Sequence, residues 1–468
     1  MPMALIEALR AAVGAAQVLH GGDLSAYELD WRKRYRGRAL AVVRPGTTDE
    51  VAAVVRACAA HRTGLVTQGG NTGLVGASVP DASGTQVLLS LGRLNRLRAV
   101  DVANQTITVE AGRVLQVVQH DAAEHGLLFP LSLAAEGSCT IGGNLATNAG
   151  GTQVLRYGNV RALCLGLEVV TASGEVWHGL AGLRKDNTGY DLQGLFIGSE
   201  GTLGVITAAT LALYPRPAAV ATALATLASL DAAVALLQLA QARLGSGLTG
   251  FEVMGDTALG LVRREFPQLA QPVSPAPWTA LIECSDAESE SHAQALFHAL
   301  LESALERGLI DDAAVATTLE QAKAMWHLRE AIPMAQAQAG PNIKHDIALP
   351  VSAIAAFTRT TDAALQRAHP GVQLVNFGHL GDGNLHYNVQ APAGADPAAF
   401  IAEFEASANA IVYDAVAAHS GSISAEHGIG VLKRDELVRR KSPVAIAMMR
   451  AVKQALDPLN IMNPGCLL

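Results

Sequence analysis

The sequence predicts an α+β fold made of two or three packed units, and three observations support this. The chain has 468 residues, more than a single hydrophobic core usually serves. Half of the residues are apolar and 16% are charged, so several cores can be filled. The composition also changes after Pro215 and Pro217, where alanine-rich helical patterns begin. We therefore expect a first domain over residues 1–215 with its core at about 38–215, a substrate domain over 216–420, and a short, mainly helical segment over 421–468 that completes the active site.

The first domain is expected to open with a strand, a turn and a helix after an amphipathic N-terminal helix. The apolar run that ends in Pro45 and Gly46 predicts the strand and turn, and helical spacing over 49–61 predicts the helix. Further along, glycine is frequent and short β-branched runs predict strands, which makes the domain mixed α+β. These runs cover residues 87–91, 106–112, 165–176 and 204–215.

In the second domain, alanine-rich amphipathic stretches alternate with strand-like runs. Helices are expected at 229–244 and 292–306, and strands at 250–255 and 279–285. We expect the helices to cover one face of an antiparallel sheet. A last helix is expected around 443–458.

Charge and cysteine content exclude several classes of protein. A net charge of -8 provides no broad basic surface for nucleic acid or an anionic membrane, so small-molecule partners are expected. The basic run 32–38 could clamp an anion or could be a solvated patch, and it stays unassigned. Five scattered cysteines without a C-x-x-C pair predict neither a disulfide framework nor a zinc knuckle. Because neither a leader peptide nor a membrane span is visible, a cytoplasmic location is expected.

Three glycine-rich loops are candidates for cofactor binding. They cover residues 67–80 (TQGGNTGLVGASVP), 130–158 and 198–207. Glycines with small polar neighbours let backbone N–H groups converge on a phosphate, although the first loop alone is equally consistent with a tight structural turn. Neither common nucleotide fingerprint, G-x-G-x-x-G opening a helix or G-x-x-x-x-G-K-[ST], is present.

Taken together and in this order, the three loops resemble the flavin domain of the vanillyl-alcohol oxidase and p-cresol methylhydroxylase (PCMH) superfamily, over most of residues 38–215. The resemblance implies a PCMH-type FAD-binding domain, in which the first loop holds the pyrophosphate and the other two line the isoalloxazine and adenine sites. Because 67–80 contains neither histidine nor cysteine, we expect noncovalent FAD. The residues implied in FAD binding are Pro45, Gln68, Gly69, Gly70, Asn71, Thr72, Gly73, Gly137, Ser138, Thr140, Gly143, Asn144, Thr147, Glu200, Gly201 and Ile206.

Residues 376–389 (NFGHLGDGNLHYNV) predict a hairpin with its turn at 381–384. In that register His379 faces His386, with Cβ atoms about 4.5–5.5 Å apart, so both imidazoles could reach one cation. A structural histidine pair is an equally open alternative. A third ligand favours metal binding, because Glu426 lies in the glycine-bracketed loop 424–430. Two imidazoles and a carboxylate form an open site for Zn²⁺ or a similar divalent ion.

These two motifs resemble the C-terminal half of the D-2-hydroxyglutarate and D-lactate dehydrogenases of the same superfamily. The resemblance implies that His379, His386 and Glu426 bind the metal and that His427 is the general base. It also implies that Asn384 lines the pocket and that Arg329 and Lys344 bind substrate carboxylates. One departure is Pro333, where the 2-hydroxyglutarate enzymes have a threonine.

The function implied is oxidation of a D-2-hydroxy acid, with D-2-hydroxyglutarate first and D-lactate as the alternative. The base removes the hydroxyl proton while hydride passes from C2 to flavin N5. An electron-transfer flavoprotein, a quinone or a cytochrome is expected as acceptor in place of NAD. No motif decides the oligomeric state, and a homodimer is the assembly that we allow for. A non-redox metal enzyme and a flavin-binding protein without turnover are the competing classes.

Overall fold

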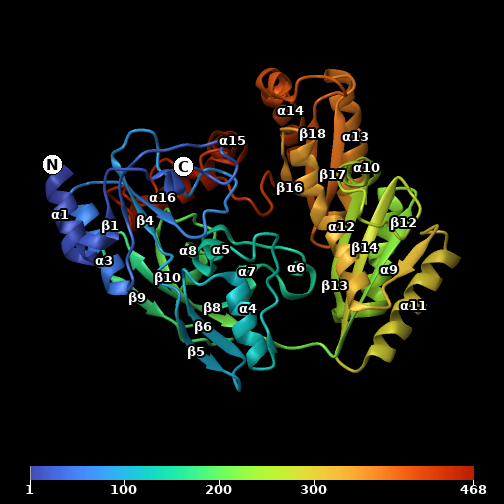
Figure 1. The fold of residues 1–468 in the computed structure, drawn as a ribbon, viewed down its shortest axis with the longest axis horizontal. Helices are drawn as coiled ribbons and strands as arrows, with labels where there is room; N and C mark the ends of the chain where they lie inside the picture. The colour runs from blue at the N-terminus through green and yellow to red at the C-terminus, as the bar shows by residue number, and fades with distance from the viewer. Residues whose placement is uncertain (1) are drawn as a thin grey trace. The chain divides into compact units, whose positions relative to one another are not determined.

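The computed structural model describes residues 2–468, which divide into two compact units (Figure 1). Unit 1 comprises residues 2–151, 158–215 and 426–468, and unit 2 comprises 152–157 and 216–425. Most of the C-terminal segment predicted over residues 421–468 therefore belongs to unit 1. Each unit is described by itself.

Unit 1 is built on sheets of four, five and two strands. The first has the order β1-β2-β4-β3, with β2, β4 and β3 parallel, and the second is antiparallel with the order β5-β6-β10-β8-β9. The expected strand runs are confirmed. The strands are β1 (Val18–Leu19), β2 (Ala39–Val43), β3 (Leu65–Gln68), β4 (Gln86–Ser90), β5 (Leu97–Asp101), β6 (Thr106–Glu110), β7 (Leu127–Leu128), β8 (Cys164–Thr171), β9 (Val176–Gly179), β10 (Gly204–Ala212) and β11 (Tyr214–Pro215).

The helices of unit 1 include the expected helix α3 (Thr48–Ala60). Its N-cap Thr47 accepts a hydrogen bond from the Glu50 N–H, and Asp49 and Glu50 stabilise its first turn through the helix dipole. One buried face of α3 packs in a core shared with α1. The other helices are α1 (Pro2–Val13), α2 (Ser25–Glu28), α4 (Leu115–Glu124), α5 (Ile141–Thr147), α7 (Val160–Leu163), α8 (Gln193–Phe196), α15 (Arg434–Arg440) and α16 (Pro443–Leu456).

Unit 2 is built on one antiparallel sheet of seven strands with the order β15-β12-β14-β13-β17-β18-β16. Its strands are β12 (Ala219–Leu227), β13 (Leu248–Gly255), β14 (Trp278–Asp286), β15 (Ala313–Val315), β16 (Asp346–Ala348), β17 (Gln373–His379) and β18 (Asn384–Gln390). Its helices are α6 (Val154–Tyr157), α9 (Leu230–Leu244), α10 (Asp256–Glu265), α11 (Glu290–Glu306), α12 (Leu319–Gln338), α13 (Ile354–Ala368) and α14 (Pro397–Ala418).

The sheet of unit 2 is covered by helices on both faces, so the prediction of one covered face is wrong. Ala223 and Ala225 of β12 belong to a core with α9, α11, α13 and α14, whereas Leu224 belongs to a core with α10 and α12. Successive residues of a strand point to opposite faces, and the central strand β13 is buried along its whole length. A sheet that is apolar on both faces needs a layer on each side.

Across residues 2–468, none of the helices combines the length and the apolar character that crossing a bilayer would require.

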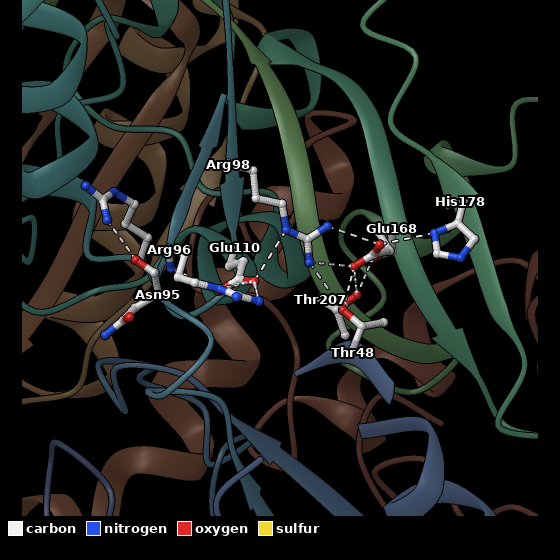
Figure 2. A network of polar contacts seen from close by, with 9 residues as sticks. Thr48, Asn95, Arg96, Arg98, Glu110, Glu168, His178 and Thr207 are labelled. Carbon is white, nitrogen blue, oxygen red and sulfur yellow. Dashed lines mark hydrogen bonds and ion pairs between the residues drawn. The ribbon is translucent and has the colours of Figure 1, made fainter. Parts of the chain in front are cut away.

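A charged network lies on one face of the five-stranded sheet of unit 1 (Figure 2). Glu168 on β8 is 4% exposed and accepts hydrogen bonds from Arg98 at 3.0 Å, Thr48 at 2.6 Å and Thr207 at 2.9 Å. Burial alone would raise the pKa of Glu168, but these bonds outweigh it and hold the pKa at about 2. Because Thr48 opens α3, the network fixes that helix to the sheet.

Replacing Glu168 with Gln should lower the free energy of unfolding at pH 7 by about 2–3 kcal/mol, because Arg98 loses the closer of its two buried counter-charges and keeps Glu110 at 3.4 Å. The pKa of Glu168 is lower in the folded chain than its ordinary value of 4.5, so its stabilisation is complete above that pH. The difference between wild type and variant should therefore shrink as the pH falls from 4.5 towards 2. Denaturant unfolding at several pH values measures it. The exposed Glu175, replaced by Gln, is the control, and an equal effect there would contradict the prediction.

Candidate active site

The three glycine-rich loops line one cavity in unit 1, together with Glu426 and His427. The predicted FAD-binding residues that line it are Gly69, Gly70, Asn71, Thr72, Gly73, Thr140, Gly143, Asn144, Thr147, Glu200, Gly201 and Ile206. Pro45, Gln68, Gly137 and Ser138 are not among the lining residues. The side-chain amide of Gln68 donates hydrogen bonds to the carbonyls of Tyr27 at 2.9 Å and Ser78 at 2.8 Å.

Glycine is required where the first two loops meet. A Cβ atom on Gly70 would lie 2.0 Å from the carbonyl oxygen of Ser138. Because that oxygen belongs to the backbone, the clash could be relieved only if one of the two loops moved. The neighbouring Asn71 has φ 52°, and its side chain donates to the Leu29 carbonyl at 2.9 Å and accepts from Ser78 at 2.8 Å. The loop is therefore held in its turn by polar contacts, while its glycines keep the backbone close to the second loop.

Two orphaned hydroxyl groups indicate that the cavity is built for a polar ligand. The side-chain oxygens of Thr67 and Thr140 are buried and have no hydrogen-bond partner among residues 2–468. Both residues line the cavity. A buried polar group without a partner destabilises a fold, so a ligand that carries donors and acceptors would repair both defects. FAD, with its phosphates and heterocycles, fits this requirement.

Glu200 uses its side chain to hold the loop that carries Glu426 and His427. Its carboxylate accepts hydrogen bonds from the N–H groups of Ile429 and Gly430, both at 2.7 Å, and burial raises the pKa of Glu200. At the other end of the loop, the Gly151 N–H donates to Glu426 at 2.6 Å. His427 is therefore presented to the cavity by a loop that is anchored at two points within unit 1.

In unit 2, the hairpin that carries His379 and His386 has another register than predicted. His386 pairs with Phe377, and His379 pairs with Glu252 of β13. The reason is the connection, which forms a 3₁₀ turn over Leu380–Asp382 and needs Gly383 at φ 82°. The direct pairing of the histidines is thus wrong, yet residues two apart share a face and diagonal neighbours can still meet. The centroids of the two rings lie 5.6 Å apart.

Glu252, which sequence reasoning missed, contacts two of the predicted site residues. It is 1% exposed, and its carboxylate lies 2.5 Å from Nδ1 of His379 and 2.7 Å from Nε of Arg329. The Arg329 guanidinium also lies over the Phe377 ring, 4.7 Å from its centroid. Burial alone would raise the pKa of Glu252, but the charges and hydrogen bonds of His379 and Arg329 outweigh it and hold the pKa at about 2. The available signal was a lone carboxylate in the apolar strand 250–255.

Asp346 is a second buried carboxylate that sequence reasoning missed. It accepts hydrogen bonds from the side-chain amide of Asn384 at 3.0 Å and from the Ala425 N–H at 3.2 Å, and its oxygen lies 3.8 Å from Nδ1 of His386. Asn384, predicted to line the pocket, is itself buried and also donates to the Ile347 carbonyl at 3.0 Å. A carboxylate thus stands beside each of the two histidines.

The remaining predicted residues of the site are distributed over the two units. Lys344 is half-buried in unit 2, two residues before β16. Glu426 and His427 belong to unit 1 and directly follow Ala425, the last residue of unit 2. The three-ligand metal site of His379, His386 and Glu426 therefore stays a prediction.

Comparison with protein families agrees with this architecture. Residues 39–179 match a family model described as an FAD binding domain, and residues 216–467 match one described as the C-terminal domain of FAD linked oxidases. The second match alone covers more than half of the chain. The chain belongs to the family of FAD-linked oxidases, and FAD is its cofactor.

Curated relatives narrow the group. The chain is 39% identical to the mitochondrial D-2-hydroxyglutarate dehydrogenase of Danio rerio, over 94% of this chain and 80% of the relative. It is 40% identical to the D-2-hydroxyglutarate dehydrogenase of Xanthomonas citri pv. viticola, over 95% and 92%. A putative D-lactate dehydrogenase of Schizosaccharomyces pombe is 36% identical over 94% and 84%. Within its family the chain groups with the FAD-dependent D-2-hydroxy acid dehydrogenases.

Solved structures confirm the fold. p-Cresol methylhydroxylase with substrate bound superposes with a TM-score of 0.78 at 18% identity, covering 99% of this chain and 96% of that one. 4-Ethylphenol oxidase from Gulosibacter chungangensis gives 0.75 at 18% identity, with the same coverage. The α+β fold that the resemblance to the vanillyl-alcohol oxidase and PCMH superfamily implied is confirmed.

Replacing Thr140 with Val should weaken FAD binding without destabilising the FAD-free protein. The hydroxyl has no partner among the described residues, so its removal relieves a buried defect, while the holoenzyme loses one hydrogen bond. The dissociation constant of FAD should rise about fivefold, measured by flavin fluorescence.

Thr222 provides the matched control. It lies in unit 2 and also carries a buried hydroxyl without a partner among the described residues. Thr222→Val should leave FAD affinity unchanged. Equal affinities in wild type and Thr140→Val would show that Thr140 does not contact FAD.

Proposed function

We propose that this chain oxidises D-2-hydroxyglutarate to the corresponding 2-oxo acid with noncovalent FAD and a divalent metal ion. The observation that carries the proposal is the position of His427, which lines the same cavity as the three FAD loops and sits on a loop fixed by Glu200 and Gly151. The curated relatives named D-2-hydroxyglutarate dehydrogenase support the substrate. D-Lactate is the alternative, supported by the relative of that name.

His379, His386 and Glu426 are the residues that would hold the metal, with Zn²⁺ as the first candidate. Two imidazoles and a carboxylate suit this ion and leave a coordination position open to substrate. The protonation of His379 suits a metal ligand. An ionised Glu252 can only accept a hydrogen bond, so the proton of the neutral His379 ring lies on Nδ1 and the lone pair that coordinates an ion lies on Nε2. When bound, the cation lowers the pKa of the substrate hydroxyl and FAD accepts the hydride from C2.

His427 is the group that we assign to proton removal. An imidazole has an ordinary pKa of about 6.5, so its neutral form is available near pH 7 to take the C2 hydroxyl proton. Because its loop is anchored at both ends, little motion is needed to keep the base in place. Positioning of this kind makes a general base effective.

Arg329 and Lys344 are proposed to recognise the carboxylates, and together they favour a diacid. Among the described residues, the hydrogen-bond partner of the Arg329 guanidinium is Glu252, which engages Nε. The terminal Nη1 and Nη2 groups then form a fork that matches a carboxylate. Pro333 in α12 can donate no backbone hydrogen bond and supplies no hydroxyl, so the two cations carry the recognition.

The electrons must leave the flavin for an acceptor. We propose an electron-transfer flavoprotein, a quinone or a cytochrome, because the sequence contains no G-x-G-x-x-G fingerprint that opens a helix and could bind NAD in addition to FAD.

The holoenzyme should lose its flavin absorbance near 450 nm when D-2-hydroxyglutarate is added without oxygen. In His427→Asn, FAD should remain bound, while the rate of flavin reduction should fall by about 10²-fold or more because the general base is gone. Stopped-flow absorbance measures both. An unchanged rate in the variant would exclude His427 as the base.

Two controls separate the competing classes. Removing metal with a chelator and restoring Zn²⁺ should abolish and recover reduction, and an unaffected rate would exclude the metal role. A holoenzyme that binds FAD but is reduced by none of the D-2-hydroxy acids would contradict the proposed function.

Replacing Lys344 with Met should impair the diacid selectively. Loss of a charged contact to a carboxylate should raise KM for D-2-hydroxyglutarate about tenfold, while KM for D-lactate should change by less than about twofold. Steady-state kinetics with an artificial acceptor measures both constants. The exposed Lys323, replaced by Met, is the control in the same unit. Equal changes for the two substrates would refute the diacid assignment.

A further inference from the structure

One buried carboxylate connects the proposed metal ligand His379 to the proposed substrate residue Arg329. Glu252 lies on the central strand β13, directly opposite His379 in the register of the sheet. Its two oxygens are divided between the partners, with Oε1 at 2.5 Å from Nδ1 of His379 and Oε2 at 2.7 Å from Nε of Arg329. All three residues belong to unit 2.

The contact decides which nitrogen of His379 can bind a metal. Because a carboxylate accepts hydrogen bonds and donates none, the proton of the neutral ring must lie on Nδ1. The lone pair is then on Nε2, the form that coordination requires. Residues that fix a ligating histidine in this way also fix the plane of its ring.

The same carboxylate decides where the Arg329 guanidinium lies. Nε is held by Glu252, and the planar group rests on the Phe377 ring at 4.7 Å. Two contacts in different directions leave a planar fork little freedom, so Nη1 and Nη2 are held in one orientation. A bidentate contact to a carboxylate depends on that orientation.

We infer that Glu252 is a positioning residue that couples metal binding at His379 to recognition of the distal carboxylate by Arg329. The inference rests on the proposed function and goes beyond it, because Glu252 itself touches neither substrate nor metal. Its role is to set two other side chains at once. A side chain that cannot accept hydrogen bonds from both partners should therefore weaken zinc binding and reduce the preference for the diacid, two properties that are otherwise independent.

Glu252→Gln tests this because an amide has one acceptor and one donor end. If the amide oxygen faces His379, the amide NH₂ meets the N–H donor of Arg329 and displaces that side chain. If the oxygen faces Arg329, the NH₂ donates to Nδ1 of His379 and the ring proton moves to Nε2, where it blocks coordination. The metal-bound enzyme must adopt the first arrangement, in which the Arg329 side chain is displaced.

Two measurements on the FAD-loaded enzyme are therefore needed. The Zn²⁺ dissociation constant, obtained by competition with a chromophoric chelator, should rise about 10- to 100-fold in Glu252→Gln. At saturating Zn²⁺, the ratio of KM for D-2-hydroxyglutarate to KM for D-lactate should rise about tenfold.

Glu283→Gln is the matched control. Glu283 is likewise a buried carboxylate of the same sheet, on the adjacent strand β14, where it accepts from Trp326 at 2.7 Å. The Glu283→Gln substitution should leave both the zinc affinity and the KM ratio near their wild-type values. If Glu252→Gln does not fold, Glu252→Asp is used instead, since its shorter side chain cannot span both partners and should move both quantities in the same directions.

The outcomes separate the two proposals. If wild type is reduced by D-2-hydroxyglutarate and binds Zn²⁺, but Glu252→Gln resembles Glu283→Gln, the coupling is wrong and the proposed function stands. A change in only one of the two quantities likewise overturns the coupling. If wild type neither binds Zn²⁺ nor reacts with the diacid, both proposals fall.

Discussion

A carboxylate that becomes buried on folding must have its charge compensated, and three such carboxylates organise this chain. Glu168 is compensated by Arg98 and two hydroxyl groups, Glu200 by two backbone N–H groups, and Glu252 by Arg329 and His379. In each case the partners come from segments far apart in the sequence. The requirement to compensate a buried charge therefore fixes the position of helix α3, of the loop that carries the proposed base, and of two proposed site residues.

The features that the sequence predicted well are those written in local residue patterns. The three glycine-rich loops could be recognised because a close backbone approach or a left-handed turn requires glycine at that position, as the contact between Gly70 and Ser138 illustrates. Strands such as β10 were visible for the same reason, since a run of β-branched and apolar residues is itself local.

The features that the sequence did not predict depend on which distant segments meet. The register of the β17–β18 hairpin followed from a 3₁₀ turn and from the pairing of His379 with β13, neither of which a count of turn residues reveals. Glu252 and Asp346 were missed for a similar reason, because the sequence around an acidic residue in an apolar strand does not indicate which distant side chain it will contact. The second layer of helices on the seven-stranded sheet is likewise a consequence of burial on both faces.

The two proposed substrate cations differ in what they can contribute. The charge of Arg329 is already balanced by Glu252, so its value to a ligand lies mainly in the geometry of its fork. Lys344 is half-buried and presents a compact charge on a flexible side chain, which adds attraction with little directional preference. Orientation and affinity would thus come from different residues. In the proposed site a diacid would use both contributions, whereas a monoacid whose one carboxylate binds the metal would use neither.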